Sequence, residues 1–336
     1  MRELSLGSAL LRKGQDVILS PEKERLYLGI DGGQSSTTAV IGNSAGAVLG
    51  RGRGGPCNHI TGAEAHAKFV RAVGDCLRAA CGQAGLDFNT IHFAAACLGF
   101  SGGTEDKEAY ARELIRSDLW KITTDAEIAL SGALKAEPGI IVIAGTGSIA
   151  LGRNASGKMA RAGGWGYLFG DEGGAFYLVK EALRASLRAE EGWGPETRLR
   201  EMLLQTWNAC TADELMHRWY GVSRSEIAAH AGLVEQAARE GDATAMHICE
   251  SAAKHLAGYA EAVRGVLFST EGTVPVGYVG GVFQSEIIRD AFARETARLR
   301  CIAQAPVMSP AYGALLEAMR LDGNTNDLTI TQHEIK

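Results

Sequence analysis

The sequence has few of the features that mark membrane, nucleic-acid-binding or disulfide-stabilised secreted proteins. No apolar run approaches the roughly 20 residues that a membrane-spanning helix needs, and residues 1–24 show no signal-peptide pattern. The net charge of -5 provides no basic field for nucleic acid. Seven scattered cysteines without a Cys-x-x-Cys pair predict reduced, mostly buried thiols. We therefore expect a cytoplasmic protein that binds neither membrane nor nucleic acid.

Metal-ligand spacing is also missing among the eight histidines, whereas apolar sequence is plentiful. Of the 336 residues 46% are hydrophobic and 22% are charged, which is enough to bury the cores of two domains. The first half is predicted to run β-β-β-α-β-α-β-α, and from Gly139 this order nearly recurs, with a long helical block at 175–268. We predict an α/β fold of two duplicated domains, with a hinge near residues 131–138 and a ligand cleft between the domains.

Two glycine-rich loops repeat one design about a hundred residues apart. Each lies between two short apolar segments, which predicts a β-hairpin turn, and in neither does a helix follow as in a dinucleotide fold or a P-loop. Glycine permits close approach, so that backbone N–H groups and nearby hydroxyls can bind phosphate. One such loop alone is more often an ordinary turn, but two matched loops favour a nucleotide site formed by Gly33, Gln34, Ser35 and Ser36 with Gly145, Thr146, Gly147 and Ser148.

Two aspartates follow strand-like segments. Asp31 adjoins the first loop, where it can hold a water molecule of a phosphate-bound Mg²⁺, although a turn-capping role is also common for aspartate. Asp125 lies between a strand-like segment and a helical one, where an N-cap is the ordinary role. Because α/β folds place chemistry at the carboxyl ends of strands, we favour Asp125 as the general base that accepts a hydroxyl proton during attack on a γ-phosphate.

The segment Gly163-Gly-Trp-Gly-Tyr-Leu-Phe-Gly-Asp-Glu-Gly-Gly174 is costly to order unless its backbone approaches a ligand. Asp171 can accept hydrogen bonds from sugar hydroxyls while Trp165 walls the pocket; the alternative is an irregular loop before an acidic helix N-terminus. Residues 167–169 are expected to be core. Two turns are weaker candidates. The turn that holds Asn58 can provide a polar contact, and the turn with Gly280 and Gly281 can flank an adenine.

Seven motifs in the same order resemble those of the N-acetylglucosamine kinase family, within the BadF/BcrA-type branch of the actin-like ATPase and sugar-kinase superfamily. They are Asp31-Gly-Gly, Gly55-Pro-Cys-Asn-His59, Thr123-Thr-Asp-Ala126, Gly145-Thr-Gly-Ser148, Gly164-Trp-Gly with Gly170-Asp-Glu-Gly173, Val279-Gly-Gly-Val282 and Pro310-Ala-Tyr-Gly-Ala314. The resemblance implies two ribonuclease-H-like domains that close over ATP and an amino sugar, with phosphoryl transfer to the sugar 6-hydroxyl. We expect Mg²⁺ as cofactor and a homodimer.

The resemblance also implies domain bounds and residue roles. After a loosely ordered lead-in at 1–24, it places the first domain at 25–132, with a closing helix at 311–322, and the second at 133–310. Asp125 falls at the catalytic base. The sugar contacts it implies are Asn58, Asp125, Ser148, Gly164, Trp165, Gly166 and Asp171, and the ATP contacts are the two loops with Ala237, Gly280 and Gly281.

The sequence departs from the family pattern at four positions. Ile149 stands where the animal enzymes carry a sugar-contacting asparagine, and Gly174 replaces a serine, so glucosamine and N-acetylmuramic acid are alternatives to N-acetylglucosamine. Gln34 and Ser36 replace the commoner glycine and basic residue, which leaves charge neutralisation to Mg²⁺.

Two other functions are compatible with this branch. An ATPase that acts as a redox activator needs cysteines that bridge an iron–sulfur cluster between subunits, and only Cys76 or Cys97 suggests itself. A non-catalytic sugar-responsive regulator is disfavoured, because no helix-turn-helix segment precedes Asp31.

Overall fold

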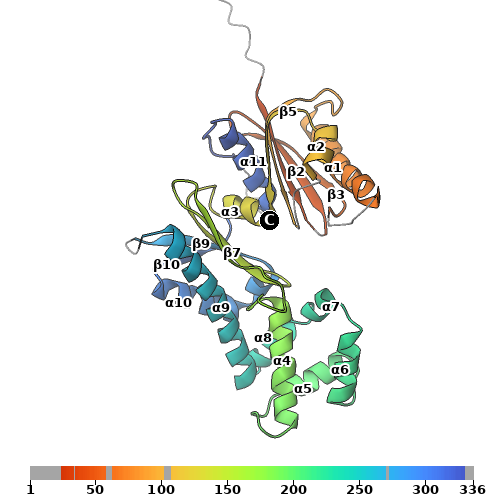
Figure 1. Ribbon diagram of the computed structural model, residues 1–336, viewed down its shortest axis with the longest axis vertical. Helices are drawn as coiled ribbons and strands as arrows, with labels where there is room; N and C mark the ends of the chain where they lie inside the picture. The colour runs from red at the N-terminus through yellow and green to blue at the C-terminus, as the bar shows by residue number, and fades with distance from the viewer. Residues whose placement is uncertain (1–23, 34, 58–62, 102–106, 270–271, 330–336) are drawn as a thin grey trace, which may run out of the picture.

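Two five-stranded sheets with the same strand order organise the chain (Figure 1). The computed structural model describes residues 24–33, 35–57, 63–101, 107–269 and 272–329. The first sheet has the order β3-β2-β1-β4-β5, and its strands are β1 (Leu26–Gly32), β2 (Thr37–Asn43), β3 (Val48–Gly54), β4 (Phe93–Phe100) and β5 (Ser117–Thr124). The second has the order β10-β9-β6-β7-β8, with β6 (Gly139–Ala144), β7 (Ser148–Arg153), β8 (Met159–Gly163), β9 (Val274–Val279) and β10 (Cys301–Gln304).

The two sheets are topological copies of each other. In each, the first three strands form an antiparallel meander and the last two run parallel to the first strand. Both sheets therefore collect the carboxyl ends of three parallel strands and one hairpin turn at a single edge. The predicted duplicated α/β fold is confirmed.

Helices from opposite ends of the chain cover the first sheet. Helices α1 (Ala63–Ala84) and α2 (Lys107–Leu114) lie on one face, and α3 (Asp125–Ala133) and α11 (Pro310–Leu321) lie on the other. Side chains alternate along β1 as a strand requires: Leu28 packs in the cluster with α1, and Tyr27 packs in the cluster with α11. Figure 1 shows α11, in blue, beside strands of the first sheet, so a helix from the end of the sequence covers strands from its beginning.

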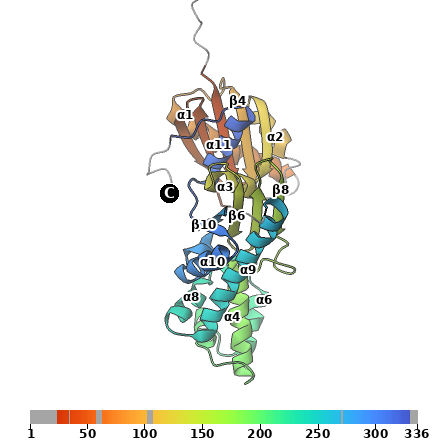
Figure 2. The same cartoon turned by 90° about the vertical axis from the view of Figure 1, so that its left-hand side faces the viewer.

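The second sheet carries a large helical layer. Its helical elements are α4 (Ala175–Glu190), α5 (Leu199–Thr206), α6 (Ala212–Tyr220), α7 (Arg224–Ala228), α8 (Gly232–Arg239), α9 (Ala243–Leu267), the 3-10 turn η1 (Gly281–Gln284) and α10 (Glu286–Arg298). The block predicted at 175–268 is thus six helices. Helix α9 packs on β6, β7 and β8, while α4 to α8 extend away from the first sheet (Figures 1 and 2). Within the described ranges, no helix is long and apolar enough to cross a bilayer.

Helix α3 lies between the two sheets, as both views show. On the side of the second sheet, Ala129, Leu130 and Ala133 of α3, with the C-cap residue Leu134, pack against Ile141, Ile143 and Val279. A Cβ atom at Gly139, the first residue of β6, would lie 2.4 Å from Leu134, so the end of α3 meets the start of β6. Helix α3 therefore runs antiparallel to β6, and its first residue lies toward the carboxyl edges of both sheets.

Buried ion pairs join the two halves where the chain crosses between them. Glu317 of α11 contacts Lys121 of β5 at 2.5 Å and Arg153 of β7 at 2.6 Å, and it accepts a hydrogen bond from Ser131. Burial alone would raise the pKa of Glu317, but Arg153 and Lys121 lower it to about 2. The guanidinium of Arg153, which also donates to the carbonyl of Ala136 at 3.0 Å, thus ties the second sheet to the first.

Candidate active site

The first glycine loop is a tight hairpin turn between β1 and β2. Gly32 pairs with Thr37, and the N–H of Gly33 donates to the carbonyl of Ser36 at 3.0 Å, which closes the turn. A Cβ atom at Gly32 would lie 2.2 Å from the ring of Phe100, so close packing requires glycine there. Among the described residues, the N–H of Ser36 has no acceptor, which leaves it available to a phosphate oxygen. Gln34, at the centre of the turn, lies outside the described residues.

Asp31 and Asp125 approach each other at the carboxyl edge of the first sheet. Asp31 is in register with Gly99 of β4, which is in register with Thr123 of β5, and Asp125 follows as the first residue of α3. Burial, followed by the negative charge of Asp125, raises the pKa of Asp31 to about 6. The two carboxylates therefore lie close enough for the charge of Asp125 to act on Asp31.

Asp125 does not cap its helix. The N-cap of α3 is Thr124, whose hydroxyl accepts the N–H of Glu127 at 3.3 Å. One oxygen of Asp125, Oδ1, accepts the N–H of Ala126 at 2.8 Å, and within the described part of the chain the other oxygen has no protein donor. The capping role that is ordinary for aspartate is filled by its neighbour, and Asp125 keeps an oxygen that can accept a substrate proton.

The second glycine loop, between β6 and β7, is a shorter turn than the first. The N–H of Gly145 donates to the carbonyl of Gly147 at 2.9 Å, two residues along, whereas Gly33 in the first loop bonds to Ser36, three residues along. The first N–H groups of α4, those of Ala175 and Phe176, donate to the carbonyls of Gly145 and Thr146 at 2.8 and 3.1 Å. Of the residues described, none accepts the N–H of Thr146. The loop thus keeps a free backbone donor on a turn that helix α4 holds in place.

The turn after β9 lies beside this second loop. Val279 pairs with Ile143 of β6, and a Cβ atom at Gly280 would lie 2.2 Å from the carbonyl oxygen of Ala144. With a φ of 112°, Gly280 adopts a conformation that other residues rarely reach. A Cβ atom at Gly281 would meet none of the described atoms within 4 Å. The structure therefore brings Gly280 and Gly281 to the edge that Gly145 and Thr146 occupy.

Asp171 is buried against the second loop. Its Oδ1 accepts the N–H of Ser148 at 3.4 Å, and its Oδ2 pairs with Arg224 of α7 at 3.2 Å. A Cβ atom at Gly147 would lie 2.3 Å from Oδ2 of Asp171, so the carboxylate fills the space beside that glycine. Sequence reasoning missed Arg224, because a short helix 53 residues further along the chain supplies it. No local pattern marks it.

The segment between β8 and α4 brings further predicted residues to the same place. The N–H of Gly164 donates to the carbonyl of Ser148 at 3.0 Å, and Gly164 and Gly166 both have positive φ. The indole of Trp165 is 66% exposed, with the guanidinium of Arg161 4.6 Å from its ring centre. The expectation that residues 167–169 are core is wrong, because Tyr167, Leu168 and Phe169 are 45%, 71% and 83% exposed. The glycines on both sides allow the loop to project from the sheet instead of packing on it.

Two residues predicted to contact a ligand, Ala237 and Asn58, are not seen beside the glycine loops. The methyl group of Ala237 is fully buried in the helical core, and its carbonyl accepts the N–H of Asp242 at 3.0 Å. Asn58 lies outside the described residues. The roles of both stay predictions from the sequence.

The cysteines suggested for a cluster are buried. Cys76 and Cys97 both have side chains with no exposed surface, and burial raises the pKa of the Cys76 thiol to about 12. In the described part of the chain, Cys210 is the exposed cysteine and the other six are buried. A cluster shared between two subunits requires accessible thiolates, so the structure argues against Cys76 and Cys97 as its ligands.

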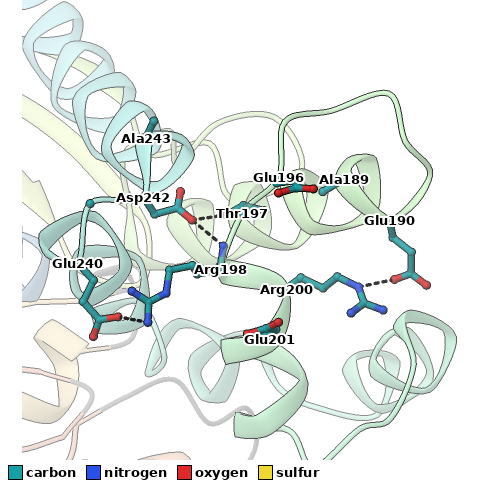
Figure 3. A pocket seen from close by; sticks show the side chains of 11 residues that line it. Ala189, Glu190, Glu196, Thr197, Arg198, Arg200, Glu201, Glu240, Asp242 and Ala243 are labelled. Atoms are coloured by element: carbon teal, nitrogen blue, oxygen red, sulfur yellow. Dashed lines mark hydrogen bonds and ion pairs between the residues drawn. The ribbon is translucent and has the colours of Figure 1, made fainter.

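A separate cavity of about 780 Å³ opens at the far end of α4 (Figure 3). It lies about 20 Å along that helix from the second glycine loop. Its two guanidinium groups are already paired, Arg198 with Glu240 at 2.8 Å and Arg200 with Glu190 at 3.0 Å. Asp242 is occupied by Thr197 and by the N–H of Arg198. Both guanidinium groups and Asp242 thus have partners within the protein, and none of the predicted site residues lines this cavity.

Duplicated α/β halves, a glycine hairpin at the carboxyl edge of each sheet and two carboxylates beside the first hairpin together define an actin-like ATPase of the sugar-kinase type. The sequence matches the BadF/BadG/BcrA/BcrD ATPase family over residues 28–318, and the chain belongs to this family. The family resemblance indicated by the ordered motifs is confirmed.

Sequence relatives and a solved structure agree with this assignment. The chain is 34% identical to the N-acetylmuramic acid/N-acetylglucosamine kinase of Clostridium acetobutylicum, over 78% of this chain and 86% of that protein. It is 29% identical to the N-acetyl-D-glucosamine kinase of Dictyostelium discoideum, over 81% and 90%. A crystal structure from Chromobacterium violaceum, provisionally named an N-acetylglucosamine kinase, superposes with a TM-score of 0.69 at 30% identity, covering 87% of this chain and 98% of that one.

Proposed function

We propose that this protein is an ATP-dependent kinase that phosphorylates the 6-hydroxyl of N-acetylglucosamine or a close relative, such as glucosamine or N-acetylmuramic acid. The observation that carries the proposal is the pair of carboxylates, Asp31 and Asp125, at the edge that also holds the first glycine hairpin. The names of the two sequence relatives support an amino sugar as acceptor.

Asp125 is the catalytic base of this proposal. Its unoccupied carboxylate oxygen accepts the proton of the sugar hydroxyl while the sugar oxygen attacks the γ-phosphorus. The new bond from the sugar oxygen to phosphorus forms, the bond from the γ-phosphorus to the bridging oxygen of the β-phosphate breaks, and ADP leaves. Helix α3 fixes the position of Asp125 through its packing against both sheets. Placement of the base by a buried helix favours the proximity and orientation that phosphoryl transfer requires.

Asp31 fits a role near Mg²⁺. The nearby negative charge of Asp125 contributes to the raised pKa of Asp31, and a divalent cation held through water would relieve this repulsion. When bound, Mg²⁺ neutralises charge on the phosphate oxygens. The residues of the two hairpins, Gly33, Gln34, Ser35, Ser36, Gly145, Thr146 and Gly147, bind the phosphates in this proposal, with Gly280, Gly281 and Ala237 toward the nucleoside.

The sugar site is assigned to the second half. We place the sugar against Ser148, Gly164, Trp165, Gly166 and Asp171, with Asn58 and Asp125 contributed by the first half. The contacts that support this are those of Asp171 and Gly164 with Ser148. The ligand cleft then lies between a first domain of residues 25–132 with 311–322 and a second of 133–310. The packing of α11 on the first sheet supports the discontinuous first domain. The homodimer and the cytoplasmic location stay predictions.

An ATP-consumption screen over amino sugars tests this function. We expect ADP formation with N-acetylglucosamine, glucosamine or N-acetylmuramic acid, and a ³¹P-coupled NMR signal that places the new phosphate on the 6-oxygen. The Asp125→Asn protein is the matched blank. No ADP above that blank with any amino sugar, or a phosphate on a different oxygen, would contradict the proposal.

A further inference from the structure

An arginine of β3 lies at the edge of the first glycine hairpin. Arg53 is in register with Thr38 of β2, and Thr38 is in register with Asp31 of β1. The three residues therefore form one row across neighbouring strands, spaced about 5 Å apart. Because residues in register across a sheet share a face, Arg53 lies on the same face as Asp31, about 10 Å away across two strands.

The neighbours of Arg53 fix this orientation. A Cβ atom at Gly52 would lie 1.9 Å from the carbonyl oxygen of Cys76, and one at Gly54 would lie 2.1 Å from that of Ala72. Both glycines thus face helix α1 at contact distance, and Arg53 between them projects from the opposite face. Its guanidinium Nη2 donates to the hydroxyl of Ser36, in the turn itself, at 3.3 Å.

Arg53 is a cation without a carboxylate partner. Its side chain is exposed, and no carboxylate of the described residues lies within ion-pair distance of it. Arg51, two residues earlier on the same strand, instead has its guanidinium 5.6 Å from the ring centre of Tyr312. The turn from Gly33 to Ser36 contains no lysine or arginine. Arg53 therefore supplies the positive charge that the turn lacks.

We propose that Arg53 binds a phosphate of the nucleotide held by the first hairpin. A guanidinium can donate two parallel hydrogen bonds to a phosphate, and such charge-assisted bonds are stronger than those from neutral donors. The two ends of the row then differ in charge. Arg53 neutralises phosphate charge at one end, and at the other end Asp31 holds, through water, a cation that neutralises the rest. This assignment rests on the proposed function, because it presumes that the hairpin binds ATP.

Calorimetric titration with a non-hydrolysable ATP analogue, in the absence of sugar, tests the assignment. Arg53→Gln is expected to weaken binding by about 10- to 100-fold, as the loss of a charge-assisted contact typically does. Arg51→Gln is the matched control on the same strand and is expected to bind within about twofold of the wild type. Because Arg53 is exposed, we expect both variants to fold, and circular dichroism checks this.

A rescue variant separates a charge at the turn from other effects. Since Arg53 reaches the Ser36 hydroxyl, Ser36→Lys in the Arg53→Gln background returns a cation to the same place and is expected to recover most of the lost affinity. Adenosine, which lacks phosphates, should bind both proteins equally. Equal affinity of wild type and Arg53→Gln for the ATP analogue overturns the role of Arg53 alone. A wild-type protein that binds no ATP analogue overturns the proposed function as well.

Discussion

The two glycine hairpins share a topology and differ in what surrounds them. The first ends a strand that carries Asp31, adjoins Asp125 at the start of α3, and has Arg53 within hydrogen-bond distance of its turn. The second is held by the N–H groups of α4 and by buried Asp171, and its neighbours include the exposed Trp165. Charged groups available to a ligand gather at the first hairpin, whereas structural contacts gather at the second.

This difference indicates how a duplicated fold divides one reaction. In the proposed function, the first half supplies the base and the groups that respond to phosphate charge, and the second half supplies a rigid turn and a projecting loop. Helix α3 lies between the two halves with its first residue toward both. The following predictions test whether the two halves are distinct in function and coupled in structure.

Removing the base should have the largest effect. Asp125→Asn keeps the size of the side chain and is expected to lower kcat about 10²- to 10⁴-fold, because it removes the proton acceptor. Sugar and ATP affinities, measured by calorimetry, should stay near the wild-type values. Asp75→Asn, an exposed position on α1, is the control. Activity of Asp125→Asn within threefold of the wild type would exclude Asp125 from the mechanism.

Breaking the ion pairs between the halves should come next. Glu317→Gln leaves Lys121 and Arg153 without their buried partner and is expected to lower the free energy of unfolding by about 3–5 kcal/mol, measured by urea denaturation. Glu108→Gln, which breaks an exposed i,i+4 pair with Arg112, should cost less than about 0.5 kcal/mol. Equal effects of the two substitutions would show that the buried pairs do not hold the halves together.

The same carboxylate predicts a pH dependence of stability. The folded-state pKa of Glu317 is lowered from 4.5 to about 2, so its ion pairs stabilise the folded protein fully above about pH 4.5. That contribution is lost as the pH falls from 4.5 toward 2. We expect the loss of unfolding free energy over this range to be smaller in Glu317→Gln than in the wild type. Parallel curves for the two proteins would contradict this.

Closure of the two halves should couple their ligands. If ATP and the sugar both bind the closed arrangement of the two halves more tightly than the open one, the sugar tightens ATP binding, and ATP tightens sugar binding by the same factor. Coupling of about 5- to 150-fold is typical of such systems. Titration of a non-hydrolysable ATP analogue with and without saturating sugar measures it. Equal affinities in the two titrations would favour a rigid, preformed pocket.

A smaller effect is expected at the second hairpin. Arg224→Gln removes the ion pair with Asp171 and should raise the KM for the sugar about tenfold, with little change in the KM for ATP. Arg218→Gln on the preceding helix, which removes an exposed pair with Glu214, is the control. A change in the KM for ATP larger than that for the sugar would mean that the second hairpin is not specialised for the sugar.

The fold was predictable from the sequence because its signals are local. Each glycine loop lies between two apolar segments, and the repeat of this pattern from Gly139 predicted the duplication before any contact was known. The same local signals placed Asp31 and Asp125 at the carboxyl edge of the first sheet. The sequence did not show whether Thr124 or Asp125 caps α3, because either residue type can cap a helix. Only the backbone geometry assigns the cap to Thr124.

The contacts that the sequence did not reveal come from distant elements. Arg53 reaches the first hairpin through strand register, and Arg224 reaches the second from a helix with no recognisable motif. Residues 167–169 were misassigned as core because their composition is apolar, whereas the glycines around them let the segment project outward. Apolar composition predicts burial only where the backbone leads the side chains inward.

The place of α11 also has a consequence for how the chain is made. This helix, residues Pro310–Leu321, covers the face of the first sheet that Tyr27, Val40 and Cys97 present, and Asp322 after it binds Arg25 and Tyr27 at the start of β1. During synthesis the second sheet and its helices therefore emerge before the first sheet can bury that face. The half that is translated first is therefore the last to be completed, because a chain that ends before residue 310 lacks the helix that covers this face.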